Sequence, residues 1–135
     1  MRGEPYNNKG FIYNQSYNMK NVGEVIKGSS SKGYLLKKPS QSINYVECHD
    51  NLTFYDKLKN DLVTLKKEDE KNYIILSLGT VILSIGIPFI NAGQELMRSK
   101  QGIDNTYNLG LDINGLTYRY KENYQEIIDA LKCFI

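Results

Sequence analysis

The sequence predicts an α/β fold built around parallel strands. Two strand-like segments each end in polar residues, helical segments alternate with them, and the uncharged run from Tyr73 to Ile90 joins a helix to the second strand. Strands that alternate with helices are typical of parallel sheets. A two-stranded parallel pair covers neither of its own edges. We therefore expect the chain to pair with further polypeptide or to be part of a larger fold.

The N-terminal third predicts a loop and then a short helix. Residues 1–18 are rich in Asn, Tyr and Gly, which favours a loop. Apolar residues then recur at helical spacing as far as Gly28, a natural stop for a helix. We expect a helix over residues 19–27 and a polar connection over 29–38.

The first strand is expected over residues 42–48, which are β-branched and aromatic enough to favour extended backbone. Three polar residues, 49–51, follow the strand directly. A short helix is then predicted to run through Leu58, and either Asn51 or Thr53 can cap its N-terminus.

The uncharged run 73–90 predicts a buried helix over 73–85 that leads into a buried strand over 87–91. A charged stretch, 66–71, precedes it. The run touches the lower length limit of a membrane span, but the Gly-x-Pro that contains Pro88 would break a helix before it crossed a bilayer. Strands of a parallel sheet covered on both faces read as continuous apolar runs, as this one does.

The C-terminal part predicts a long loop and a final helix. Residues 91–115 carry Gly, Asn and Asp throughout, which favours a loop. Apolar residues after it form one helical stripe, so the chain closes within a helix or just after it. The stripe consists of Tyr124, Ile127, Ile128, Leu131 and Phe134.

Composition excludes some classes of partner. Hydrophobic residues make up 41%, charged residues 24%, and the net charge is +2, which gives no reason to expect a nucleic acid or an anionic membrane surface. Cys48 and Cys133 lie far apart outside any metal-binding spacing, and two free thiols are expected. The N-terminus shows no secretory signal, which slightly favours the cytoplasm. If the chain is part of a longer protein, its compartment stays open.

Polar residues at the ends of the two strands are where chemistry is expected, as in α/β barrels. Residues 47–50 (Glu-Cys-His-Asp) look like metal ligands, but successive strand residues point to opposite faces, which separates Glu47 and His49 from Cys48 and Asp50. The chain also has no second histidine, so no metal site is predicted. Neighbours on a strand also cannot form an activated Cys–His pair. Asp50, together with Glu95 after the next strand, would provide two carboxylates. From chemistry alone, His49–Asp50 is more often a loop-anchoring pair than a catalytic one.

The flanking residues carry a family resemblance. Residues 39–58 (PSQSINYVECHDNLTFYDKL) closely resemble the seventh-strand segment of type I pullulanases, within the α-amylase superfamily. Residues 86–95 (GIPFINAGQE) are similar to their eighth-strand segment, with its Gly-x-Pro and Gly-Gln-Glu signature. Matches continue over 96–114, and shorter ones lie upstream at residues 2–3 and 10–11. The resemblance thus covers nearly the whole chain.

The resemblance implies that residues 1–135 are the C-terminal part of a (β/α)8 catalytic barrel, with roughly its last two βα units and flanking helices. The family hydrolyses α-1,6 branch linkages in pullulan, glycogen or starch with retention of configuration. The resemblance implies no cofactor. Asp50 would be the third catalytic carboxylate, and Glu95 would buttress its strand end. The substrate-binding residues would be His49, Arg98, Asn105 and Tyr107.

The sequence also departs from the family. Nothing matches the fourth and fifth strands, which carry the family's nucleophile and general acid, and Ile85 replaces a usual Gln. Met1 looks like a secondary start. We therefore expect the chain to be inactive alone and to need the N-terminal part of the barrel as well as an α-glucan as partners. The alternatives are a non-catalytic glucan-binding module and a non-functional remnant.

Overall fold

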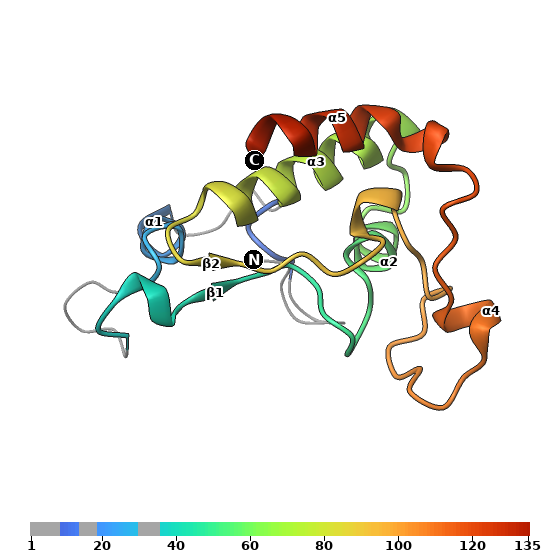
Figure 1. Ribbon diagram of the computed structural model, residues 1–135, viewed down its shortest axis with the longest axis horizontal. Coiled ribbons are helices and arrows are strands. Elements are labelled where there is room, and N and C mark those ends of the chain that lie inside the picture. The colour runs from blue at the N-terminus through green and yellow to red at the C-terminus, as the bar shows by residue number, and fades with distance from the viewer. Residues whose placement is uncertain (1–8, 14–18, 30–35) are drawn as a thin grey trace.

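Two short parallel strands lie at the centre of the computed structural model, which describes residues 9–13, 19–29 and 36–135 (Figure 1). Strand β1 (Ile43–Asn44) pairs with β2 (Ile87–Pro88). The ladder is held by Ile87 N–H donating to Ser42 O at 2.8 Å and Phe89 N–H donating to Asn44 O at 2.9 Å. The α/β character and the parallel pairing are confirmed, whereas membership of a (β/α)8 barrel stays a prediction.

Both strands are shorter than the sequence predicts. The expected strands 42–48 and 87–91 each contribute only two residues to the ladder. Within the described part of the chain, each strand has one neighbouring strand, which is the other member of the pair. Where the two backbones diverge, neither has a second strand with which to continue the ladder, and the regular strand ends. The rest of both segments connects the strands to the loops that carry the polar residues.

The longest helices lie on one side of the strand pair (Figure 1). The four longest are α1 (Met19–Ile26), α2 (Phe54–Asp61), α3 (Lys67–Leu83) and α5 (Gln125–Phe134). The shorter ones are η1 (Pro39–Gln41), η2 (Gln94–Leu96), α4 (Leu111–Asn114) and η3 (Lys121–Tyr124). The predicted helices over 19–27 and at the C-terminus are therefore confirmed. The predicted loop 91–115 contains η2 and α4 but is otherwise irregular.

Helix α3 begins six residues earlier than predicted. The charged stretch that was expected to lead into it forms its first turns instead, with Glu68, Asp69 and Glu70 near the N-terminus. Carboxylates there interact favourably with the helix dipole, which is why a charged stretch can start an apolar helix. Within the described residues, no helix has the length and apolarity that a bilayer span requires.

Helix α2 starts where one of the two predicted caps places it. Thr53 is the N-cap, and its Oγ1 accepts a hydrogen bond from Asp56 N at 3.0 Å. The other candidate, Asn51, lies two residues earlier with a φ of 62°, in the left-handed region that Asn tolerates. Asn51 therefore turns the chain after the first strand rather than capping the helix.

The apolar core lies between α3 and the elements on either side of it. Ile74, Leu78 and Val81 of α3 are fully buried and share one cluster with Phe54 of α2 and Ile127 of α5. Helix α5 lies along α3 (Figure 1). A Cβ on Gly79 would lie 3.0 Å from Cζ of the Phe134 ring, so the missing side chain permits this close approach.

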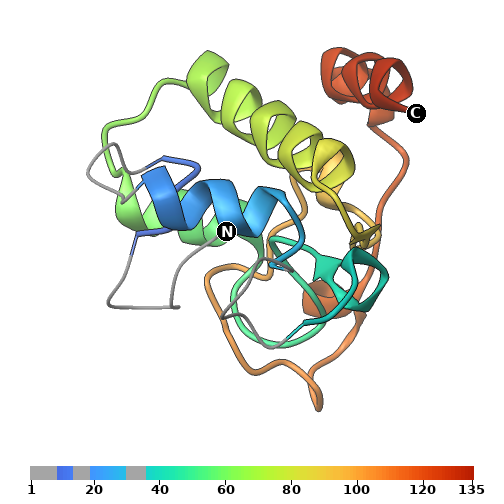
Figure 2. The ribbon, with the colours of Figure 1, turned by 90° about the vertical axis from the view of Figure 1, so that its left-hand side faces the viewer.

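The long connection from η2 through α4 extends away from the helices, as the orange segment in both views shows (Figure 1, Figure 2). It begins beside α2 and returns to η3. The expected loop over residues 1–18 and the connection over 29–38 fall largely outside the described residues, as do the upstream family matches at residues 2–3.

We expect Gly86→Ala to destabilise the chain by roughly 1–3 kcal/mol, because Gly86 has a φ of 140° that side-chain-bearing residues rarely adopt. An added Cβ would also lie 2.8 Å from Asn44 Nδ2 and 2.9 Å from Ser42 O. The matched control is Gly23→Ala in α1, where a Cβ meets nothing within 4 Å and should stabilise the helix by about 0.5–1 kcal/mol. Urea denaturation measures both, and equal midpoints would contradict the prediction.

Candidate functional site

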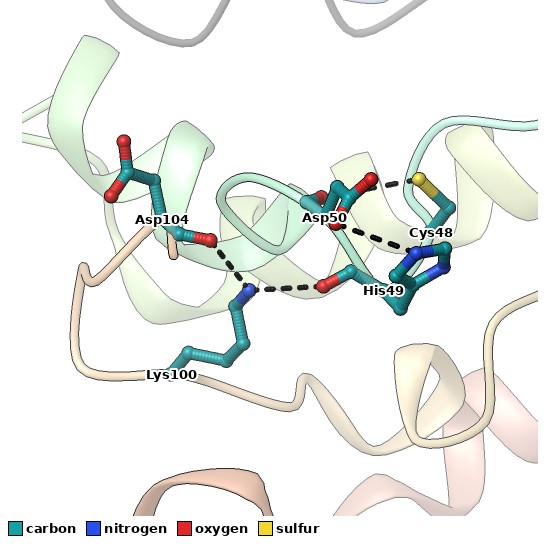
Figure 3. Close-up of polar contacts among 5 residues, drawn as sticks. All are labelled: Cys48, His49, Asp50, Lys100 and Asp104. Carbon is teal, nitrogen blue, oxygen red and sulfur yellow. Dashed lines mark hydrogen bonds and ion pairs between the residues drawn. The ribbon is translucent and has the colours of Figure 1, made fainter. Parts of the chain in front are cut away.

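The turn at residues 49–51 presents two polar side chains to solvent beyond the first strand. His49 Nε2 lies 3.4 Å from Asp50 Oδ1, and the side chains are 88% and 72% exposed (Figure 3). An exposed pair of this kind contributes little to stability. Both side chains are therefore free to contact a ligand. The Sγ of Cys48 points back to Asp50 O at 3.9 Å.

Glu47 has a separate, structural role directly before this turn. Its side chain is buried, with the residue 1% exposed, and accepts hydrogen bonds from Phe54 N at 2.6 Å and Asn91 Nδ2 at 3.1 Å. It thus joins the ends of both strand segments to the first turn of α2. The prediction that Glu47 and His49 share one face of a strand is wrong, because the regular strand ends at Asn44.

The residues that look like metal ligands in the sequence do not converge on one point in the structure. Glu47 is buried against main-chain and amide N–H groups, whereas His49 faces solvent. Across residues 9–13, 19–29 and 36–135, no three His, Cys, Asp or Glu side chains are placed to hold a metal ion. Cys48 and Cys133 are free thiols.

Lys100 lies beneath the turn, and no pattern in the sequence predicts a role for it. Its Nζ donates to His49 O at 3.3 Å and to Asp104 O at 3.0 Å, and the residue is 2% exposed (Figure 3). Burial lowers the pKa of Lys100, and the charge of Arg98 lowers it further, while the carboxylates of Asp56, Asp104 and Asp50 act to raise it.

Asp56 of α2 fixes the backbone from which Lys100 extends. Its Oδ2 accepts from Lys100 N at 2.7 Å and its Oδ1 from Ser99 Oγ at 2.5 Å. Asp56 is itself buried. The only sequence signal for this role is an acidic residue in the first turn of a helix, which does not identify the partner.

The other predicted substrate-binding residues lie on the long connection. Asn105 is exposed and its N–H donates to Asp104 Oδ1 at 2.7 Å, while Tyr107 is 85% exposed. Because Lys100 binds Asp104 O, this stretch is tied to the His49–Asp50 turn. Arg98 is half-buried instead, and its Nη2 donates to Asn114 O at 2.9 Å at the end of α4.

Glu95 is engaged within its own loop. Its Oε2 accepts a hydrogen bond from Gly93 N at 3.1 Å. The carboxylate also raises the pKa of Tyr118, with burial and their hydrogen bond as smaller causes. These contacts bind the Glu95 carboxylate to its own loop and to Tyr118, and a buttressing role at the strand end stays a prediction.

Comparisons with known proteins give a consistent similarity, although no protein-family profile matches the chain. It is 35% identical over 129 residues to pullulanase of Bacillus subtilis (strain 168), which covers 93% of this chain and 18% of the relative. It is 38% identical over 88 residues to pullulanase 1, chloroplastic, of Arabidopsis thaliana, covering 63% of this chain and 9% of the relative.

Solved structures agree. The chain superposes on pullulanase type I from Bacillus subtilis str. 168 complexed with maltose with a TM-score of 0.87 and 35% identity, covering 94% of this chain and 18% of that one. For pullulanase from Paenibacillus barengoltzii in complex with maltohexaose and alpha-cyclodextrin, the TM-score is 0.86 at 31% identity, with 94% and 20% covered. The chain thus spans about a fifth of the length of these proteins.

We expect Glu47→Ala to destabilise the chain by about 3 kcal/mol, because it leaves the buried Phe54 N–H without its charged acceptor. The control Glu68→Ala removes an exposed carboxylate from the first turn of α3 and should cost less than about 1 kcal/mol. Thermal unfolding followed by circular dichroism measures both. Equal melting temperatures for the two variants would show that Glu47 does not join these elements.

Proposed function

The chain is homologous to a segment of the type I pullulanases, and we propose that it supplies one wall of the active site of a pullulanase-type glycoside hydrolase. The reaction is hydrolysis of α-1,6-glucosidic branch linkages in pullulan, glycogen or starch, with retention at the anomeric carbon. The observation that carries the proposal is the exposed His49–Asp50 turn. It lies in a chain that is 35% identical to a pullulanase over 93% of the chain's own length.

Asp50 has the properties needed for a carboxylate that binds the sugar without transferring a proton. Its side chain is largely exposed, while its main chain belongs to a turn held from below by Lys100. A fixed carboxylate can accept hydrogen bonds from sugar hydroxyls, and bonds that strengthen as the ring gains positive charge lower the barrier. His49 is placed beside it to bind the same sugar.

Asn105 and Tyr107 are proposed to extend this surface to a neighbouring sugar unit. Both are exposed, and Tyr107 offers an aromatic face with an attached hydroxyl. Arg98 completes the proposed set, although one end of its guanidinium group binds Asn114 O. An α-glucan is the proposed ligand because the similar Bacillus and Paenibacillus structures are described as complexes with maltose and maltohexaose.

The 135-residue chain is proposed to be an incomplete catalytic domain that does not hydrolyse glucans by itself. Retaining glycosidases need two carboxylates about 5–5.5 Å apart at the scissile bond, and the family resemblance assigns neither of them to a residue of this chain. Asp50 is the one catalytic carboxylate that the resemblance assigns to this chain.

The sheet supports a need for further polypeptide. The face of β1 and β2 opposite the helices exposes Ile43, Tyr45, Ile87 and Phe89. Parallel strands are normally covered on both faces. We propose that the rest of a pullulanase-type barrel covers this face, with the two strands in the seventh and eighth positions.

We expect the purified chain to release no reducing sugar from pullulan at any concentration. A chimera in which this chain replaces the homologous segment of Bacillus subtilis pullulanase should hydrolyse pullulan, because it restores the missing carboxylates. Reducing-sugar assays measure both. Turnover by the chain alone, or a folded chimera without activity, would overturn the proposal.

In the active chimera, Asp50→Ala should lower kcat by at least about 100-fold, because it removes a group that stabilises transition-state charge. Binding of maltotriose should change much less. Asp69→Ala, an exposed carboxylate on α3, is the control and should leave kcat unchanged. Equal kcat values for the two variants would remove Asp50 from the proposed role.

A further inference from the structure

We propose that Lys100 is a positioning residue that holds the His49–Asp50 turn and the 104–107 stretch in one fixed arrangement. The inference rests on the proposed function, since it assigns a task to the support of the proposed sugar-binding surface. Lys100 itself does not reach that surface, because it lies beneath the turn and is 2% exposed.

The geometry favours a link between two segments over a simple ion pair. The ammonium group donates to His49 O, 51 positions earlier, and to Asp104 O, four positions later (Figure 3). Both acceptors are main-chain oxygens, so these bonds fix the path of the backbone rather than a side-chain rotamer. His49 O belongs to the residue beside Asp50, and Asp104 O lies directly before Asn105.

The root of the side chain is fixed as firmly as its tip. Asp56 accepts from Lys100 N at 2.7 Å, and its second oxygen accepts from Ser99 Oγ. Lys100 is therefore hydrogen-bonded through its main chain to Asp56 of α2, and through its Nζ to the two segments that carry the proposed surface. A lysine spans this distance with a flexible stem, and two fixed ends remove that flexibility.

The charges around Lys100 show why the ammonium is tolerated there. Burial and the guanidinium group of Arg98 lower the pKa of Lys100, and the carboxylates of Asp56, Asp104 and Asp50 oppose this. Removing the ammonium would take one hydrogen bond from each of two carbonyl oxygens in a partly buried position, which is costly. We expect both backbone segments to move when it is lost.

Lys57 provides a matched control, because it is also fully buried and also bonded at its Nζ. Its partner is Asp61, at 2.6 Å and 2.7 Å, on the same helix. Loss of Lys57 should destabilise the chain without touching the His49–Asp50 turn. The comparison separates a loss of stability from a loss of position.

The first test uses the complete 135-residue chain, whose single histidine is His49. Its imidazole signal in a carbon–proton NMR spectrum is therefore assigned without ambiguity. We expect Lys100→Met to shift that signal and the amide signals of residues 49–51 and 104–107, and Lys100→Arg to restore part of the shift. Lys57→Met should leave these signals in place. If Lys100→Met leaves them in place in a folded chain, the inference fails, whatever the chain does to glucans.

The second test uses the pullulanase chimera. We expect Lys100→Met to lower kcat about 10- to 100-fold, in the range that a misplacement of about 1 Å produces, with partial recovery in Lys100→Arg. Lys57→Met should lower the melting temperature but keep kcat. An active chimera in which Lys100→Met keeps full kcat would overturn the inference alone, whereas an inactive parent chimera would overturn the proposed function and leave the NMR result to decide the role of Lys100.

Discussion

Buried carboxylates that accept hydrogen bonds from main-chain N–H groups hold the loops of this fold in place. The sheet cannot do this, because its ladder is only two residues long on each strand. Glu47 binds the N–H of Phe54, and Asp56 binds the N–H of Lys100. Both bonds converge on the first turn of α2, whose own N-cap is Thr53. Hydrogen bonds to a charged acceptor are stronger than neutral ones. The arrangement at the polar end of the strands thus depends on one buried helix.

The helices could be predicted from the sequence because their apolar faces recur at helical spacing and their stops and caps are local. The start of α3 was missed because its charged first turns carry no apolar stripe. The strands were predicted too long, since residue preferences for extended backbone persist to Cys48 while the ladder depends on a partner. Pairing is a property of two segments, and the sequence of one segment does not contain it.

The candidate site could likewise be predicted only in part from the sequence. The His49–Asp50 turn was recognisable because the twenty-residue segment that contains it, residues 39–58, resembles a known family. Lys100, Asp56 and Glu47 were not recognised, because each acts through a main-chain atom distant in the sequence. Main-chain acceptors are present at every residue, so a sequence offers no sign of which ones a side chain will choose.

The packing of α5 on α3 limits which substitutions this sequence can accept. A glycine costs the interior of a helix about 1 kcal/mol relative to alanine, yet Gly79 stands against the Phe134 ring with almost no space for a Cβ. Positions 79 and 134 are therefore coupled: a side chain gained on one helix requires a smaller one on the other. Across diverging copies of this chain, the two positions should change together, with the glycine kept wherever the ring is kept.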